Sequence, residues 1–442
     1  MWCSIRHKLF YLLFALVLSA CSSSVPDNTI RMGLTTAPTN LDPRFATDAI
    51  SSRINRLLYR RLVEFDPTGM PIPSLATWQL VTPAHYRFTL LNSGRSFHNG
   101  SRLVAADVKA TFDSILDPAT GSPHRATLDV IQRIAIKGDD RIDFFLKRPD
   151  SLLPGYLSIG ILPADLMRQG HKFSTQPIGS GPFVFSGWPQ AGVARLTRIK
   201  DRQPFEFIPV ADPSVRVLKL LRGEIDMLQN DLPPELVDYL TGKEGIRVTR
   251  HPGNNFSYLG FNLQDRFTGQ LKIRRAIAHA IDRTAIIKYF LNDGAVPAQA
   301  LLPPQHWAGA KGLKPYSFDP QQARLLLQQA GFTRAKPLRL NFKTSTDPFR
   351  VRLATLIQSQ LSQVGIKLSI QSNDWGTFYG DVKGGRFQIY SLSWVGIKTP
   401  DIFRYVFHSA SLPPNGANRG RFNSEVVDAI IDQAEATADF SE

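Results

Sequence analysis

Apolar residues that recur at every second position are the most frequent pattern along the chain, and this period of two predicts β-strands. The pattern is clearest at 142–147, which begins Ile-Asp-Phe, and at 338–343, which reads Leu-Arg-Leu-Asn-Phe-Lys. Further strands are expected at 29–34, 86–91, 133–137, 194–200, 258–263, 367–371 and 387–394.

Amphipathic segments with helical spacing lie between these strands. Asp319 followed by Pro320 is a helix-start signal, and the segment QQARLLLQQA after it ends at Gly331. Further helices are expected at 52–63, 107–116 and 350–364. Strands that alternate with helices predict an α/β fold class.

The first twenty residues have the pattern of an export signal. Basic Arg6 and Lys8 precede ten uninterrupted apolar residues, a run too short for a comfortable transmembrane span. The string Leu-Ser-Ala-Cys that ends at Cys21 resembles the lipobox of bacterial lipoproteins, which implies cleavage before this cysteine and acylation of its sulfur. We therefore expect a signal peptide at 1–20, a lipidated tether at 21–28, and a protein anchored to a membrane of the cell envelope through Cys21. An ordinary signal peptide or an uncleaved anchor is the alternative.

The composition narrows the class of protein. The chain has 442 residues, 43% of them hydrophobic and 20% charged, which excludes collagen-like, coiled-coil and wholly disordered proteins. At roughly 150 residues per domain, this length predicts two or three domains. The net charge is +15, and such a basic excess favours anionic surfaces. Lys and Arg are nevertheless dispersed and no nucleic-acid-reading motif occurs, so we expect no nucleic-acid partner.

Motifs for catalysis and metal binding are absent from the sequence. It contains no GxSxG, SxxK, HExxH or GxxxxGK[ST] string, and its nine histidines are scattered. Cys3 and Cys21 are the only cysteines, too few for a disulfide scaffold or a Cys-based zinc site. We expect no catalytic residue, no metal site and no cofactor, with a metal site built from distant histidines left open. Gly-Ser-Gly at 179–181 is interpreted as a turn rather than a phosphate cradle, because Pro182 removes an amide.

Aromatic residues are frequent in several segments near the expected domain junctions. Most buried aromatics belong to a hydrophobic core, but aromatics near domain junctions also line clefts for small ligands. Both interpretations stay open for Phe256, Tyr258, Trp307, Trp375, Trp394 and Phe403.

Short strings distributed along nearly the whole chain carry a family resemblance. The densest are YLGFN at 258–262 and RRAIAHAIDR at 274–283. Others are LDP at 41–43, PSLA at 73–76, FHNG at 97–100, PIGSGPF at 177–183, LRGEID at 221–226 and Trp394 with Pro400-Asp401. In this order they resemble the family 5 extracellular solute-binding proteins, which are the peptide-, dipeptide- and nickel-binding components of ABC importers.

The resemblance implies a fold, a two-lobed α/β clamp of the type II, cluster C-like periplasmic-binding-protein class. Lobe one is expected at 29–56 and 175–250, an inserted subdomain at 57–174, and lobe two at 251–442. The lobes of such a clamp close on their ligand by a hinge motion, and the closed form presents both lobes to a membrane permease.

The end of the sequence departs from the family pattern. Family members continue beyond a helix like the one expected at 425–436 and return to lobe one, whereas this sequence stops at Glu442. We therefore expect the C-terminal return segment to be missing. A fragment, a truncated gene product and a shortened variant all stay open.

The resemblance also implies where the ligand is bound. The matching positions are Thr36 and Thr39 after the first strand, Asn254 and Phe256 in the crossover, Trp375, Trp394 and Asp401. In peptide-binding members an aspartate three residues after the tryptophan pairs with the α-amino group of the peptide, but this sequence has Ile397 there. Asp401 follows four residues later and is the candidate substitute. The alternative is that Trp394 and Asp401 only shape the loop.

These expectations combine into one hypothesis. The protein is a monomeric, lipid-anchored, non-catalytic receptor in the periplasm that captures oligopeptides for the permease subunits of an ABC importer in the inner membrane. Two alternatives stay open. In the first, the same fold binds a small-molecule solute such as a nickel chelate, haem, an opine or an oligosaccharide. In the second, the protein is a degenerate envelope lipoprotein that acts as a sensor or scaffold without transport.

Overall fold

The structure of the protein is a computed structural model, and it describes residues 27–229, 232–414 and 416–437. The predicted signal peptide and Cys21 lie outside the described residues. The chain divides into two compact units. Unit 1 contains the residues up to Ala37 together with 182–229, and unit 2 contains 38–181 together with the residues from 232 onward. The division into two lobes and an inserted subdomain stays a prediction.

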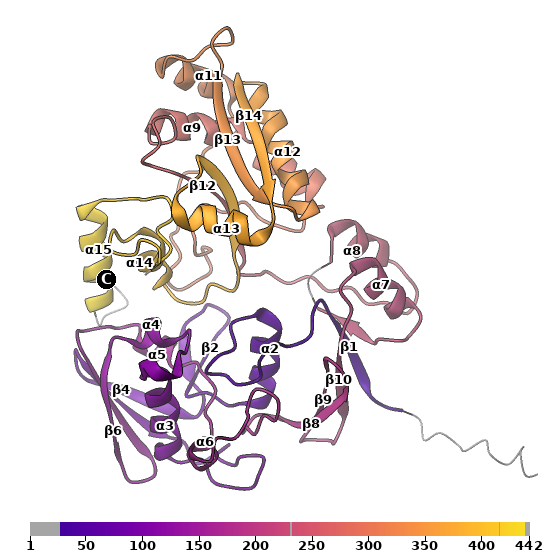
Figure 1. Ribbon diagram of the computed structural model, residues 1–442, viewed down its shortest axis with the longest axis vertical. Helices are drawn as coiled ribbons and strands as arrows, with labels where there is room; N and C mark the ends of the chain where they lie inside the picture. Colours follow the sequence, from indigo (N-terminus) through magenta and orange to yellow (C-terminus); the bar gives the residue numbers. More distant parts are fainter. Residues whose placement is uncertain (1–26, 230–231, 415, 438–442) are drawn as a thin grey trace, which may run out of the picture. The chain divides into compact units, whose positions relative to one another are not determined.

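Unit 1 is built on a five-stranded sheet with the strand order β11-β1-β10-β9-β8 (Figure 1). Strand β1 lies at the N-terminal end of the described chain and pairs in parallel with both β10 and β11, while β8, β9 and β10 form an antiparallel meander. The strands span Ile30–Leu34 (β1), Phe183–Gln190 (β8), Val193–Arg198 (β9), Pro204–Pro209 (β10) and Met227–Leu228 (β11). Helix α7, Pro213–Leu221, begins where the Asp212 carboxylate accepts a hydrogen bond from the Val215 amide.

The first part of unit 2 contains an antiparallel sheet with the order β4-β5-β7-β6 (Figure 1). Its core is aromatic, because Phe144 meets Phe88 and Phe112 edge to face at 5.3 and 5.8 Å. The strands and the small β2–β3 hairpin span Val63–Phe65 (β2), Pro71–Pro73 (β3), Ala76–Thr82 (β4), His85–Leu90 (β5), Ile131–Lys137 (β6) and Arg141–Leu146 (β7). The helices are Ala49–Leu58 (α2), Ala105–Leu116 (α3), Pro118–Thr120 (η1), Arg125–Leu128 (α4), Leu153–Tyr156 (α5) and Ala164–Arg168 (α6).

The second part of unit 2 contains a mixed sheet with the order β12-β15-β13-β14. Apolar side chains of α9, α11 and α12 pack with those of the sheet in one core, and α13 contributes to a second apolar cluster with β15. The strands span Phe256–Phe261 (β12), Leu338–Ser345 (β13), Ile366–Asn373 (β14) and Ile389–Trp394 (β15). The helices are Pro234–Leu240 (α8), Leu271–Ala280 (α9), Arg283–Ala285 (α10), Ile286–Phe290 (η2), Pro320–Gln329 (α11), Pro348–Ser362 (α12), Trp375–Gly384 (α13), Ile402–Phe407 (α14) and Glu425–Ala436 (α15).

The expected strands and helices are present, and the α/β class is confirmed. The helix predicted at 52–63 is wrong at its end, because α2 stops at Leu58, Tyr59 has an extended backbone and Val63 begins strand β2. Residues 179–181 form a close-packed loop without regular secondary structure. The Gly181 amide donates to the Leu58 carbonyl at 2.8 Å, and a Cβ on Gly179 would lie 2.1 Å from that carbonyl oxygen. This loop therefore uses its glycines for packing.

Candidate functional site

Aromatic side chains gather at one end of strands β12 and β15 in unit 2. The strand register places Phe256 opposite Trp394, and Tyr258 lies two residues further along β12. The Tyr258 ring stacks on Phe256 at 6.1 Å and on Trp394 at 6.4 Å, in the second case with an interplanar angle of 11°. We call these three residues, with Arg419, Tyr379 and Trp375, the aromatic ladder.

Arg419 joins the two halves of the ladder. Its guanidinium lies 4.8 Å from the centre of the Trp394 ring and 5.4 Å from that of Tyr379. It also donates hydrogen bonds to the hydroxyl groups of Tyr258 at 2.9 Å and Tyr379 at 3.2 Å. Burial opposes the charge, but the neighbouring tyrosines outweigh burial and raise the pKa of Arg419. The ladder therefore contains a permanent positive charge.

Trp375 forms the exposed end of the ladder. It is the first residue of α13, a helix whose start is capped by the Asp374 carboxylate accepting from the Thr377 amide. Its indole stacks on Tyr379 at 5.3 Å with an interplanar angle of 7°, and 58% of Trp375 is exposed. A rigid, exposed indole backed by another ring is a surface suited to contact an apolar or planar ligand group.

The loop that follows Trp394 is held in place from the crossover segment. The Asn254 side-chain amide donates to the Ile397 carbonyl at 2.8 Å, and the Asn255 side-chain oxygen accepts from the Gly396 amide at 3.1 Å. The Ile397 side chain is buried in an apolar cluster with Leu301, Leu302 and Ile402. Asn254 thus positions the loop, and Ile397 presents no polar group to a ligand.

Asp401 lies at the end of this loop, immediately before α14. Its carboxylate accepts a hydrogen bond from the Thr399 hydroxyl. Burial raises the pKa of Asp401, and the nearby Glu435 carboxylate adds to the rise although the Thr399 bond opposes it. Asp401 also lines a cavity of about 270 Å³ in unit 2. The Asp401 carboxylate is therefore placed in a site where its charge is disfavoured.

The two threonines of the predicted site lie in different units. Thr36 is an exposed residue of unit 1. Thr39 belongs to unit 2, where its hydroxyl donates to Asp48 at 2.6 Å and its amide donates to the Ser51 hydroxyl at 2.9 Å. The structure thus brings together Phe256, Trp375 and Trp394 in the ladder. Ligand contact by the predicted site residues stays a prediction.

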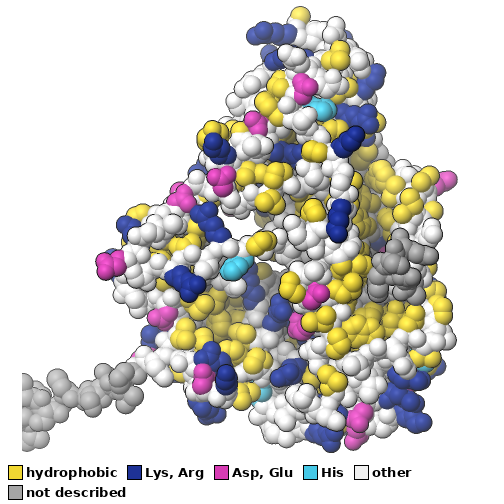
Figure 2. Space-filling view, turned by 180° about the vertical axis from the view of Figure 1, so that it is seen from behind, with side chains coloured by type: hydrophobic (Ala, Val, Ile, Leu, Met, Phe, Trp, Pro, Cys, Tyr) yellow, Lys and Arg dark blue, Asp and Glu magenta, His cyan; other side chains and the backbone are white. Residues whose placement is uncertain are grey.

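Sequence reasoning missed Arg419 and Tyr379 as members of the ladder. Neither carries a local signal, because Tyr379 reads as an ordinary residue of α13 and Arg419 as one of many dispersed cations. On the face shown in Figure 2, Lys and Arg side chains are likewise scattered among other residue types. Tyr258 is among the aromatic residues for which the sequence leaves a core role and a ligand-cleft role open.

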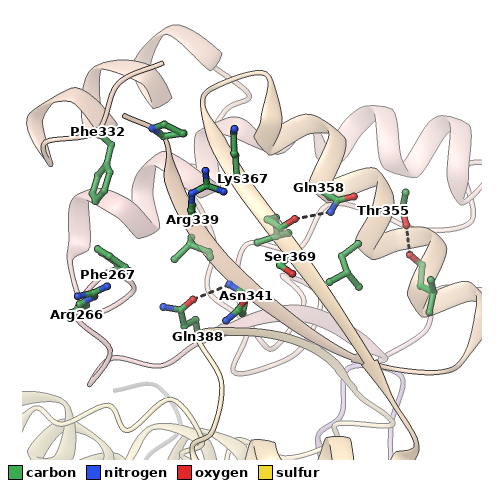
Figure 3. A pocket seen from close by; sticks show the side chains of 15 residues that line it. Arg266, Phe267, Phe332, Arg339, Asn341, Thr355, Gln358, Lys367, Ser369 and Gln388 are labelled. Carbon is green, nitrogen blue, oxygen red and sulfur yellow. Dashed lines mark hydrogen bonds between the residues drawn. The ribbon is translucent and has the colours of Figure 1, made fainter. Parts of the chain in front are cut away.

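A larger and more open hollow of about 970 Å³ lies along strands β13 and β14 and helix α12 (Figure 3). Its polar side chains include Arg339, Asn341 and Lys367, which are spread along the strands rather than directed at one point. The Gln388 side chain is already engaged there, since it accepts from the Asn341 amide at 2.9 Å and donates to Asp265 at 3.0 Å. This hollow contains no member of the aromatic ladder.

Within the described ranges, no group of three or more His, Cys, Asp or Glu side chains stands close enough to hold a metal ion. None of the helices in the described part of the chain is both long enough and apolar enough to cross a membrane.

The mixed α/β architecture with its several sheets defines the class of protein as a type II periplasmic-binding fold. The sequence family described as "Bacterial extracellular solute-binding proteins, family 5 Middle" matches residues 71–412. The chain belongs to this family of solute-binding proteins, so the resemblance stated from the short strings is confirmed.

Individual relatives agree with this assignment. A Pseudomonas aeruginosa protein named "Probable di/tripeptide-binding protein 5" is 30% identical over 86% of this chain and 79% of its own length. The structure of NikZ from Campylobacter jejuni in complex with Ni(L-His) is 25% identical with a TM-score of 0.78, covering 94% of this chain and 88% of that one. DppA from Helicobacter pylori in complex with the peptide STSA shares the fold at 24% identity, with a TM-score of 0.75 over 93% and 88% of the two chains.

Proposed function

We propose that this solute-binding protein is the peptide receptor of an ABC importer and that the aromatic ladder contacts the bound peptide. The observation that carries the proposal is the exposed stack of Trp375 on Tyr379, continued through Arg419 to Trp394. Stacked rings bind apolar side chains and peptide planes with little sequence preference. The name of the Pseudomonas relative supports a peptide of two or three residues as the ligand class.

The proposal also assigns the protein a location in the cell. The protein would act as a monomer in the periplasm, tethered by a lipid on Cys21, and would deliver its ligand to permease subunits in the inner membrane. It would carry out no reaction and need no cofactor. Three further predicted contacts belong to this proposal, namely Thr36, Thr39 and Asp401, as does closure of lobe two on lobe one.

One observation favours a second candidate, a solute without a free amine. Ile397 is buried among apolar residues, and Asp401 is already bonded to Thr399. Neither position offers an unengaged carboxylate to a ligand ammonium group, which would be costly to bury unpaired. NikZ, which binds a nickel–histidine complex, shows that this fold accommodates other cargo.

Native mass spectrometry of the exported protein tests both candidates. The protein is expressed with its own leader, extracted in mild detergent and released from the micelle in the gas phase. Bound masses that resolve into di- and tripeptides are the expected result. A folded protein that carries a single non-peptide solute contradicts peptide binding and favours the second candidate. The intact mass reports acylation at the same time, and Cys21→Ser is the matched control that should lose it.

A further inference from the structure

The cavity of about 270 Å³ in unit 2 has a polar lining that the aromatic ladder does not use. It lies among residues of α2, strand β2, α5 and the loop before α14. The lining residues that matter for its chemistry are Asn55, Arg61, Phe65, Tyr156, Lys398 and Asp401.

Asn55 is a buried side chain without a hydrogen-bond partner. Only 4% of the residue is exposed, and neither its amide nitrogen nor its side-chain oxygen has a partner in the described part of the chain. Its backbone carbonyl is satisfied by the Tyr59 amide at 2.9 Å, so only the side chain is left open. Buried amides are nearly always hydrogen-bonded, because leaving one unpaired forfeits its hydration. An unpaired side-chain amide in the wall of a cavity therefore indicates that a polar group of a ligand enters the cavity and forms a hydrogen bond with it.

Two cations stand in the same wall. The Lys398 ammonium lies 5.7 Å from the centre of the Phe65 ring and has no ion pair among the described residues. Burial, together with Arg61 and Arg56, lowers the pKa of Lys398 to about 8. Arg61 is 8% exposed, and the one ion pair that it forms among the described residues is with Glu64 at 3.8 Å. Neighbouring cations in a partly dry cavity repel each other, and an anion placed between them removes that repulsion.

The carboxylate in the cavity lining, Asp401, interacts with different charged residues from those that surround Lys398. Asp401 is bonded to Thr399 and interacts with Glu435, whereas Lys398 interacts with Arg61, Arg56 and Glu64. Burial lowers the pKa of His124, which also lines the cavity. The formal charge of the lining is thus two cations against one carboxylate.

We infer that this cavity binds the carboxylate end of the solute, with Lys398 and Arg61 supplying the opposing charge and the Asn55 amide donating a hydrogen bond. The inference rests on the proposed function, and it names the part of a peptide that enters the cavity. A volume of about 270 Å³ is small for a whole ligand, since ligand pockets usually measure about 300–1,000 Å³. The cavity therefore takes the end of a peptide, while the ladder contacts the rest.

Affinity capture from two peptide libraries tests this assignment. One library contains random di- and tripeptides with free C-terminal carboxylates, and the other contains the same sequences as C-terminal amides. The full exported protein in detergent is expected to capture the acids at least tenfold more strongly than the amides. Lys398→Met should reduce this preference to below threefold, and Lys398→Arg should restore most of it. Lys367→Met, which changes an exposed lysine of strand β14, is the matched control and should leave the preference unchanged.

Asn55→Leu separates a ligand role from a structural one. Because both polar atoms of Asn55 lack a protein partner, an apolar side chain of similar size should raise the thermal midpoint while it lowers the capture of acids. Equal capture of acids and amides by the unmodified protein overturns the inference but leaves peptide binding standing. A preference for acids that Lys398→Met does not reduce overturns the inference in the same way. Capture of no peptide from either library overturns the proposed function, and the inference falls with it.

Discussion

Single side chains set the properties of the aromatic ladder, and Trp394 contacts both a ring and the cation within it. It stacks on Tyr258, meets Tyr405 edge to face at 5.9 Å and lies under the Arg419 guanidinium. We expect Trp394→Leu to weaken peptide binding about 30-fold, since central aromatic residues of binding surfaces contribute about 2 kcal/mol or more. Isothermal titration with the peptides that co-purify measures the change.

A control is needed because Trp394 also packs against the buried apolar cluster around Ile397. Trp188→Leu changes a tryptophan that lies in strand β8 of unit 1, outside the ladder. It should leave the affinity within about twofold. An unchanged affinity in Trp394→Leu, with a folded protein, would remove the ladder from the binding site.

A substitution at Arg419 tests whether the planar shape of the guanidinium matters as well as its positive charge. Arg419→Lys keeps the positive charge but loses the flat guanidinium that lies on two rings and reaches two hydroxyl groups. The free energy of unfolding should fall by about 1–3 kcal/mol, because a compact ammonium replaces the flat fork that donates to the hydroxyls of both Tyr258 and Tyr379. Urea denaturation followed by tryptophan fluorescence measures the loss. A stability equal to that of the unmodified protein would show that the charge alone is sufficient.

At the residue scale, the sequence alone identifies only some of the side chains in the aromatic ladder and the cavity. Trp375 and Trp394 were identified from family position, and the structure shows both in one ladder. Arg419 and Lys398 are not identified from the sequence, because their contacts are with residues far away along the chain. Arg419 donates a hydrogen bond to Tyr258, and the charge of Lys398 interacts with that of Arg61. No local pattern encodes such a through-space contact.

At the scale of elements, a local capping signal is sufficient to place the start of helix α11. Helix α11 begins at Pro320, and the Asp319 carboxylate accepts hydrogen bonds from the amides of Gln321 and Gln322. We expect Asp319→Ala to lower the free energy of unfolding by about 1 kcal/mol, since the two amides lose their acceptor. Asp319→Asn retains an acceptor and should cost much less, so the pair of variants, compared by urea denaturation, isolates the cap. Equal losses in both variants would contradict the capping role.

The end of a helix is predicted less well where no glycine or proline marks it, as after Leu58. The amphipathic spacing predicts a helix as far as position 63, but Tyr59 has an extended backbone and Val63 pairs with Pro73 in a hairpin. The tertiary pairing of β2 with β3 therefore overrides the helical pattern. The order of strands in each sheet was likewise outside the reach of the sequence pattern, because period and propensity do not specify partners.

At the scale of the whole molecule, segments distant in sequence are joined by charge within unit 2. The Glu435 carboxylate at the end of α15 accepts from Arg404 at 2.7 Å and from Arg148 at 3.0 Å, and the Glu435 carbonyl accepts from the Ser151 amide at 2.9 Å. Asp150 lies within this network. The network ties the last described helix to the segment after β7, so its electrostatics bear on the stability of the unit as a whole.

Asp150 makes that stability depend on pH. Burial raises the pKa of Asp150 to about 6 from an ordinary value of 3.8, with Glu435 and Asp401 adding to the rise and the Leu152 amide and Arg148 opposing it. Because the folded-state pKa is the higher one, the neutral carboxyl stabilises the fold fully below about pH 4. This contribution is lost as the pH rises toward 6. A shift of this size corresponds to about 3 kcal/mol at most.

Asp150→Asn removes the charge and keeps an acceptor for the Leu152 amide, which Asp150 holds at 2.9 Å. We expect the variant to raise the free energy of unfolding by about 1–3 kcal/mol at pH 7.5 and to change it little at pH 4. Asp129→Asn is the control, because the exposed Asp129 pairs with Lys147 at the surface and should show a small effect at both pH values. Urea denaturation at the two pH values measures all three proteins. A gain from Asp150→Asn that is the same at pH 4 and 7.5 would mean that packing, rather than a buried charge, sets the stability of this network.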